Sequence, residues 1–222
     1  MVNFTSEAEM FDTMRDKLYA SVISDTIDSL GARNQQMRAD IRPVWEGAMV
    51  VGRAYPVLTA DIYKLVDDPY GPEIDAVDSL KPNDVMVVCT QRSTRTCFWG
   101  ELLSTAARVR GARGIVIDGY TRDVAQITKM KFPTFATGIY MVDSAGRSIV
   151  VDHNCPVDCG GVLVNPGDII FGDIDGVVVI PRELEKEVIP LALEKVSKEN
   201  LLRDELLKGS LLRDAYNNYG IL

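Results

Sequence analysis

Arg122 and Asp123 are the neighbouring residues of this chain best suited to bind a small ligand. They follow an apolar run at 115–117 and then Asp118-Gly119, a pattern typical of a buried strand that ends in a sharp turn. A guanidinium pairs with anionic groups, and a carboxylate is a ligand for hard metal ions. A surface ion pair is the common interpretation of an Arg-Asp dipeptide. The abrupt end of the preceding strand favours a binding role here.

The elements that must position this pair form a mixed pattern of helices and strands. A capping box at Ser6 and helical spacing of apolar residues predict one helix through Val22. Further helices are predicted at 24–30, 74–80, 101–110, 124–130 and from 182 onward, and strands at 48–51, 54–58, 85–89, 115–117, 132–135, 148–151, 162–164, 169–171 and 177–180. We therefore expect an α/β fold with mixed β-sheet layers and flanking N- and C-terminal helices.

Composition limits the classes of protein to which the chain can belong. Its 222 residues are 46% hydrophobic and 25% charged, which predicts one globular domain over 1–222, with N-terminal helices at 1–37 and a C-terminal helical extension at 182–222. The net charge of -8 argues against a nucleic-acid partner. No apolar run approaches the roughly 20 residues of a membrane span, and no signal peptide is evident. We expect a soluble, cytoplasmic protein with no membrane partner.

Two other groups of residues resemble metal sites less well. His153, Cys155 and Cys159 have no nearby fourth ligand for zinc, and we interpret them as a loop with incidental thiols. Asp168, Asp173 and Asp175 lack the spacing of a calcium loop and are interpreted as turn residues. His153 is the single histidine, which leaves little room for a Ser-His-Asp triad.

Three segments in order carry a family resemblance. Trp99-Gly-Glu-Leu-Leu103 is followed, with twenty residues between Glu101 and Arg122, by Arg122-Asp123, and then by the run 166–181 that begins Pro-Gly-Asp and ends Val-Ile-Pro. Together they resemble the family of regulator of ribonuclease E activity A (RraA) and the class II 4-hydroxy-4-methyl-2-oxoglutarate (HMG/CHA) aldolases. The resemblance covers most of the chain and implies a swivelling phosphohistidine-domain-like (RraA-like) fold. It also implies homotrimers or homohexamers with active sites between subunits.

The resemblance also implies roles for individual residues. Asp123 would bind a divalent metal ion, Mg²⁺ or Mn²⁺, and Glu101 would hold a water on that ion. Arg122 would lie over the 2-oxo group of the substrate. The described aldolases have aspartate where this chain has Glu101, and regulatory members tend to have glycine.

Two further roles complete the implied site. The backbone amides of Leu102 and Leu103, at a helix start after Gly100, would bind the substrate carboxylate, and a helix N-terminus suits this role on physical grounds too. Glu199 would reach the site of a neighbouring subunit and would share with Glu101 the water that acts as base; Glu194 and Glu205 lie on the same helical stretch.

We expect these residues to serve a metal-dependent lyase. It would cleave a 4-hydroxy-2-oxo acid such as 4-hydroxy-4-methyl-2-oxoglutarate to pyruvate, with oxaloacetate decarboxylation as a side activity. Lys129 and Lys131 lie in a polar stretch that does not favour a Schiff base. A non-catalytic regulator of ribonuclease E and an enzyme of the same fold acting on another carboxylic acid remain alternatives; a carboxylate at Glu101 favours the lyase.

Overall fold

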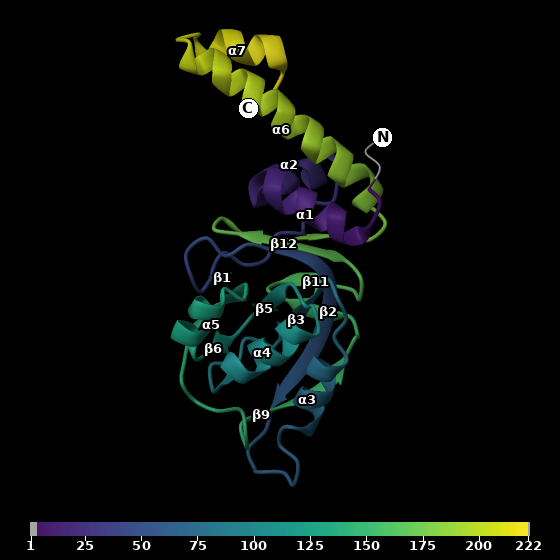
Figure 1. The fold of residues 1–222 in the computed structure, drawn as a ribbon, viewed down its shortest axis with the longest axis vertical. Helices are drawn as coiled ribbons and strands as arrows, with labels where there is room; N and C mark the ends of the chain where they lie inside the picture. The colour runs from purple at the N-terminus through teal and green to yellow at the C-terminus, as the bar shows by residue number, and fades with distance from the viewer. Residues whose placement is uncertain (1–3, 222) are drawn as a thin grey trace.

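The computed structural model describes residues 4–221; residues 1–3 and 222, which belong to the predicted domain, lie outside the described part. The helices within that part are α1 (Glu7–Lys17), α2 (Ala20–Ser29), α3 (Gly71–Asp78), α4 (Glu101–Val109), α5 (Val124–Met130), α6 (Glu185–Leu207) and α7 (Leu212–Tyr219). The helices lie in two groups, with α1, α2, α6 and α7 beyond strand β12 at one end and α3, α4 and α5 around the rest (Figure 1).

An eight-stranded mixed sheet forms the centre of the molecule. Its strands are β1 (Arg42–Pro43), β2 (Val50–Asp61), β3 (Asp84–Cys89), β5 (Gly114–Ile117), β7 (Thr134–Ala136), β9 (Ser148–His153), β12 (Ile169–Asp173) and β13 (Gly176–Ile180). The order is β1-β7-β5-β3-β2-β12-β13, and β9 pairs with the second half of β2. A bridge between Gln36 and Val178 brings the segment before β1 to β13, so the sheet is nearly closed.

Two small sheets complete the strand structure. One is parallel and consists of β4 (Cys97–Trp99), β6 (Tyr120–Thr121) and β8 (Gly138–Ile139). The other is an antiparallel pair of β10 (Val157–Cys159) and β11 (Val162–Val164). Gly100 directly follows β4 and Arg122 directly follows β6, at the same edge of this parallel sheet.

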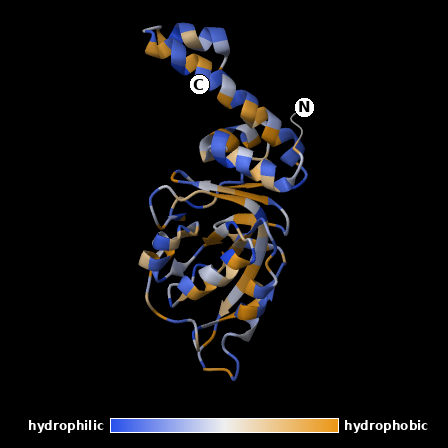
Figure 2. Ribbon diagram, in the orientation of Figure 1, coloured by the Kyte–Doolittle hydropathy of each residue, from blue (hydrophilic) through white to orange (hydrophobic). Residues whose placement is uncertain are grey.

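Successive side chains of each strand point to opposite faces of the sheet, so the sheet has a hydrophobic core on each face. On β3, Val85 and Val87 point into the space enclosed by the sheet, whereas Met86 and Val88 pack outward with α3, α4 and α5. A third apolar cluster joins α1, α2 and α6 to β12 and β13. Figure 2 shows apolar, orange residues along the strands of this sheet. The helices at the two ends are therefore attached to one continuous sheet.

The prediction of one helix through Val22 is wrong. The helix α1 ends at Lys17, the backbone of Leu18 is extended, and α2 begins anew at Ala20. The Ala20 N–H donates to Asp173 Oδ2 at 2.7 Å, so a residue far along the chain caps the new helix. Helical spacing of the apolar residues continues across the break, and the sequence pattern alone does not reveal it.

Other differences concern strands. The predicted strand 54–58 and residues 50–51 of the predicted strand 48–51 belong to the single strand β2, which begins at Val50 and continues through Gly52. The short strands β4, β6, β8 and β10 were not predicted, because two or three residues carry no periodic signal. The C-terminal helical prediction is confirmed as two helices, separated near Gly209, where φ is +95°. No helix of residues 4–221 has the length and apolar character needed to cross a bilayer.

Candidate active site

The parallel sheet of β4 and β6 brings the two predicted motifs together. Parallel strands end at the same edge, so the residues that follow β4 and β6 are neighbours. The Arg122 N–H donates to the Trp99 carbonyl at 2.8 Å, and the Thr121 hydroxyl donates to the same carbonyl at 3.0 Å. These two hydrogen bonds hold the segment after β4 beside the segment after β6.

Asp123 caps helix α4 from outside that helix. The Glu101 N–H donates to Asp123 Oδ2 at 3.0 Å, and the helix has no side-chain cap at its own N-cap residue, Gly100. A Cβ on Gly100 would lie 2.5 Å from Asp123 Oδ2, so the close approach requires glycine. Asp123 has φ 57° and ψ 32°, a left-handed conformation that is uncommon outside glycine and typical of functional turns.

The N-terminus of α4 presents backbone donors beside this carboxylate. Its first helical hydrogen bond runs from Ser104 N–H to the Gly100 carbonyl at 3.1 Å. The N–H groups of Leu102 and Leu103 precede it and have no acceptor within the helix. The first turn of α4 can therefore receive an anionic group.

Arg122 is held between two carboxylates. Its Nη1 lies 3.0 Å from Asp143 Oδ1, and its Nε lies 3.7 Å from Asp123 Oδ2. The Tyr70 hydroxyl donates to Asp143 Oδ2 at 2.6 Å. Partial burial acts to raise the pKa of Asp143, but hydrogen bonds from Tyr70 and the Ala145 N–H and the charge of Arg122 outweigh it and lower the pKa. Asp143 is therefore a stable anion that fixes the guanidinium.

Glu73 is a nearly buried carboxyl in the same region. Only 8% of its surface is exposed, and the Ser144 hydroxyl lies 3.4 Å from its Oε2. Burial raises the pKa of Glu73 to about 7, and the nearby Asp143 adds to the effect, whereas Ser144 and Arg122 oppose it. Sequence reasoning missed this residue, because an acidic residue in the first turn of a helix is ordinarily a solvated partner of the helix dipole.

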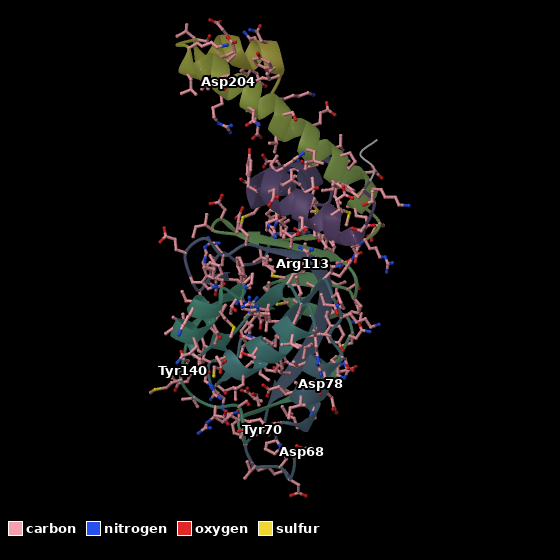
Figure 3. The ribbon with its side chains drawn as sticks, viewed as in Figure 1. Asp68, Tyr70, Asp78, Arg113, Tyr140 and Asp204 are labelled. Carbon is pink, nitrogen blue, oxygen red and sulfur yellow. The ribbon has the colours of Figure 1, made fainter. Side chains whose placement is uncertain are left out.

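These groups line one cavity of about 380 Å³. Of the predicted site residues, the structure brings six together on its wall: Gly100, Glu101, Leu102, Leu103, Arg122 and Asp123. The wall also contains polar residues that were not predicted: Tyr70, Glu73, Asp143 and Ser144. Tyr70 lies near the lower end of the view in Figure 3.

Glu199 is the predicted residue that lies elsewhere. It belongs to α6, which extends from the end of the molecule opposite α3 and α4 (Figure 1). Asp204 on the same helix and Tyr70 at the cavity are labelled at opposite ends of Figure 3. The role of Glu199 in the site of a neighbouring subunit stays a prediction.

The donors at the cavity fit a hard divalent cation. Asp123 and Glu101 supply carboxylate oxygens, the ligand type that Mg²⁺ and Mn²⁺ prefer, and Mg²⁺ usually keeps several waters. Burial raises the pKa of Cys97, also on the wall, to about 11, so this thiol is protonated near neutral pH and is a poor ligand. No cluster of three or more His, Cys, Asp or Glu side chains arranged for a metal is found in residues 4–221.

Two of the three candidate zinc ligands, His153 and Cys159, have other contacts. The Tyr55 hydroxyl lies 2.7 Å from His153 Nδ1, and the two rings are stacked. Cys159 is fully buried, and its burial raises its pKa well above the ordinary value. Both residues are therefore occupied in packing.

Comparison with known proteins defines the class of this fold and site. Residues 20–179 match the family model RraA-like, described as Aldolase/RraA. This chain belongs to the RraA-like family.

Relatives from three organisms show how far the similarity extends. The chain is 37% identical over 180 residues to the uncharacterised protein MJ0644 of Methanocaldococcus jannaschii, covering 80% of this chain and 83% of the relative. It is 32% identical over 191 residues to a Halalkalibacterium halodurans protein named "Putative 4-hydroxy-4-methyl-2-oxoglutarate aldolase", covering 86% of each. Protein DlpA of Legionella pneumophila is 30% identical over 197 residues, which are 89% of this chain and 32% of DlpA, so the chain spans about a third of DlpA.

Solved structures agree with the family assignment. An uncharacterised protein from Pseudomonas syringae pv. tomato superposes with a TM-score of 0.82 at 25% identity, covering 96% of this chain and 99% of the other. RraAS2 of Streptomyces coelicolor, described as an unusual member of the RNase ES inhibitor RraA protein family, superposes with a TM-score of 0.79 at 24% identity, covering 90% and 98%. The second similarity shows the fold alone. The predicted RraA-like α/β fold is confirmed.

Proposed function

We propose that this chain is a divalent-metal-dependent lyase that cleaves a 4-hydroxy-2-oxo acid, such as 4-hydroxy-4-methyl-2-oxoglutarate, to pyruvate. One observation carries the proposal: the guanidinium of Arg122, the carboxylate of Asp123 and the open N–H groups of α4 lie on the wall of one cavity. The name of the Halalkalibacterium relative supports the same reaction class.

Binding of the 2-oxo acid follows from these donors. Its carboxylate would accept hydrogen bonds from the N–H groups of Leu102 and Leu103, where the positive end of the helix dipole adds to the attraction. Its 2-oxo oxygen would then lie against Arg122, which Asp143 holds in place at 3.0 Å. The substrate is thus held by its carboxylate and by the 2-oxo oxygen, on which negative charge develops as the enolate forms.

Asp123 would hold the metal ion directly, and Glu101 would hold it through water. The bound ion would supply positive charge where the enolate forms. Arg122 contributes the same kind of stabilisation from the protein, because its guanidinium already points at the cavity and requires no reorganisation. The metal ion and Arg122 would therefore both stabilise the negative charge that develops on the 2-oxo group.

The reaction needs a base for the C4 hydroxyl and an acceptor for the electrons of the C3–C4 bond. Carboxylates on the wall can accept the hydroxyl proton, and the stabilised 2-oxo group accepts the electrons as an enolate. Protonation of the enolate at C3 gives pyruvate. Decarboxylation of oxaloacetate passes through the same enolate, so it should occur as a side activity.

We also propose that several copies, as a homotrimer or homohexamer, form the complete site. Glu199 belongs to α6, which extends from the end of the molecule opposite α3 and α4 (Figure 1), so a role in catalysis requires a neighbouring subunit. The exposed apolar residues Leu201, Leu207 and Leu211 near it offer surface for such contacts.

The test measures pyruvate release, coupled to NADH oxidation by lactate dehydrogenase. The substrates are 4-hydroxy-4-methyl-2-oxoglutarate and, separately, oxaloacetate, each with Mg²⁺ or Mn²⁺ and then with EDTA. We expect metal-dependent turnover that falls about 100-fold or more in Arg122→Ala and Asp123→Ala, because each removes a group that stabilises the developing charge.

A second Arg-Asp pair in the chain supplies the matched control. Arg15 and Asp16 form an exposed pair on α1, with Nε and Oδ1 3.1 Å apart. Arg15→Ala and Asp16→Ala should keep the wild-type rate. Absence of turnover on both acids with either metal would contradict the lyase proposal, and inhibition of ribonuclease E would then be tested.

A further inference from the structure

Glu73 lies on the wall of the cavity proposed to hold the substrate. Arg122 contacts two carboxylates of this cavity, with Asp123 at 3.7 Å and Asp143 at 3.0 Å. A substrate bound through C1 at α4 and through C2 at Arg122 would extend its C4 into the same cavity, whose wall also contains Tyr70, Glu73 and Asp143. The ionisable groups of this wall are therefore the candidates for accepting the proton of the C4 hydroxyl.

Most ionisable groups of the cavity are already engaged. Both oxygens of Asp143 are used, Oδ1 by Arg122 and Oδ2 by Tyr70 and the Ala145 N–H. Tyr70 donates its proton to Asp143, and this hydrogen bond raises the pKa of the phenol. Asp123 is the proposed metal ligand. None of these three is available to accept a proton.

Glu101 and Glu73 remain, and they differ in their surroundings. Glu101 is partly exposed, and its Oε1 accepts a hydrogen bond from the Thr105 hydroxyl at 3.0 Å along the surface of α4. Glu73 is 8% exposed and lines the cavity. Within residues 4–221, the only hydrogen bond of the Glu73 side chain is the 3.4 Å contact of Oε2 with the Ser144 hydroxyl. Its Oε1 has no partner there and could accept a hydrogen bond from a ligand.

We propose that Glu73 is the catalytic base that removes the proton from the C4 hydroxyl of the substrate. This inference rests on the lyase function proposed above and assigns the base of that same site. It places the proton acceptor within the chain that carries Arg122 and Asp123, and leaves Glu199 of a neighbouring subunit the proposed role of holding, with Glu101, the water on the metal ion.

The proposed step balances without a further reactant. The Glu73 carboxylate takes the hydroxyl proton, the C4–O bond becomes a carbonyl, and the electron pair of the C3–C4 bond moves to C3 and the 2-oxo group as the pyruvate enolate. Solvent at the mouth of the cavity protonates C3, and Glu73 returns its proton to solvent. Decarboxylation of oxaloacetate breaks its C3–C4 bond with loss of CO₂, and no hydroxyl proton has to leave.

The protonation behaviour of Glu73 suits this role. Burial raises its pKa to about 7, near the optimum for a base that works at neutral pH. The ionisable groups around it are Asp143, Arg122 and Tyr70, with Cys97 and Glu101 farther along the wall. Because the base must be ionised, cleavage should be fast above pH 7 and should slow as the pH falls through that value.

The experiment compares two reactions in one variant. In Glu73→Gln, kcat for cleavage of 4-hydroxy-4-methyl-2-oxoglutarate should fall about 100-fold or more, the ordinary contribution of a general base. The kcat for oxaloacetate decarboxylation should stay within about threefold of wild type, because that reaction has no hydroxyl proton to remove. The rise of cleavage rate with pH should be present in wild type and in Glu73→Asp, and absent in Glu73→Gln.

Asp75→Asn is the matched control, since it changes an exposed carboxyl to an amide on the same helix. It should leave both reactions unchanged. Equal losses of cleavage and decarboxylation in Glu73→Gln, or no loss in either reaction, would overturn the assignment of Glu73 as the base. Turnover by the wild type would still support the lyase function. Absence of both reactions in the wild type would overturn the lyase and the base together.

Discussion

Two acidic side chains on the wall of the cavity, Asp143 and Glu73, have pKa values that are shifted in opposite directions. Asp143 accepts three hydrogen bonds and lies beside Arg122, and its pKa is lowered although partial burial opposes this. Glu73 has one long hydrogen bond, and burial raises its pKa to about 7. Environments that separate the pKa values of neighbouring acids are typical of catalytic sites.

The raised pKa of Glu73 predicts a pH-dependent cost to folding. The unfolded carboxyl ionises near its ordinary pKa of 4.5, whereas the folded one keeps its proton to about 7. The stability this group contributes is therefore fully present below pH 4.5 and is lost as the pH rises through 7. Replacing Glu73 by glutamine, which does not ionise, should raise the free energy of unfolding at pH 8 relative to pH 5.5 by about 1–3 kcal/mol compared with wild type.

Urea unfolding of both proteins at the two pH values measures this difference. Curves whose separation is the same at pH 5.5 and pH 8 would show that Glu73 is not buried as described. The measurement needs no substrate and is independent of the proposed reaction.

At the scale of elements, the start of α4 is the feature on which the proposed substrate binding depends. Gly100 offers no side-chain cap, and Asp123 supplies one from the segment after β6. This arrangement uses one N–H group and leaves the next two directed to the cavity. The helix N-terminus and the carboxylate proposed to bind the metal ion are therefore in direct contact.

The role of these N–H groups can be tested without altering a charged side chain. Proline at Leu102 removes the N–H at the second position of α4, and α3 already holds Pro72 at its corresponding second position. Leu102→Ala removes the same exposed side chain but keeps the N–H. We expect the KM for the 2-oxo acid to be about 10-fold or more higher in Leu102→Pro than in Leu102→Ala, since a hydrogen bond to a charged group contributes about 1.5–3 kcal/mol.

Steady-state kinetics of the two variants provide the comparison, and circular dichroism confirms that both keep the fold. Equal KM values in folded proteins would show that the substrate carboxylate binds elsewhere.

At the scale of the whole molecule, the cavity and the long C-terminal helix lie at opposite ends. The sheet connects them, and α6 and α7 extend past it with polar and apolar residues intermixed (Figure 2). Leu207 is 79% exposed and Leu211 69% exposed, which is costly for a helix pair left in water. This shape suits contact between copies more than contact within one chain.

Mixing of two inactive variants tests whether sites are shared between subunits. Glu199→Ala and Asp123→Ala should each lack activity alone. In randomly mixed oligomers about a quarter of the sites would combine an intact Asp123 with an intact Glu199 of the neighbour, and activity should return to about that fraction. Unfolding and refolding the variants together, followed by the pyruvate assay, gives the measurement; activity that stays at the level of the separate variants would exclude a shared site.

Local signals explain what was predicted correctly. The strand 162–164 and the helix 124–130 were placed at their observed bounds, because apolar runs, turn residues and helix ends depend on neighbouring residues. The break between α1 and α2 was missed, since the Asp173 carboxylate that caps Ala20 lies 153 residues away. The strands β4 and β6 were missed because their pairing with each other, and not their composition, makes them strands.

The sequence by itself determined the α/β fold class and one wall of the candidate site. Arg122 and Asp123 could be singled out because they follow a predicted strand and turn, whereas Gly100 and Glu101 were singled out through the family resemblance. Only the tertiary structure decided the rest of the lining, where Ser144 meets Glu73 from 71 residues away and Tyr70 meets Asp143 from 73. The burial that raises the pKa of Glu73 arises from that packing, and no local pattern encodes how well a carboxyl is solvated.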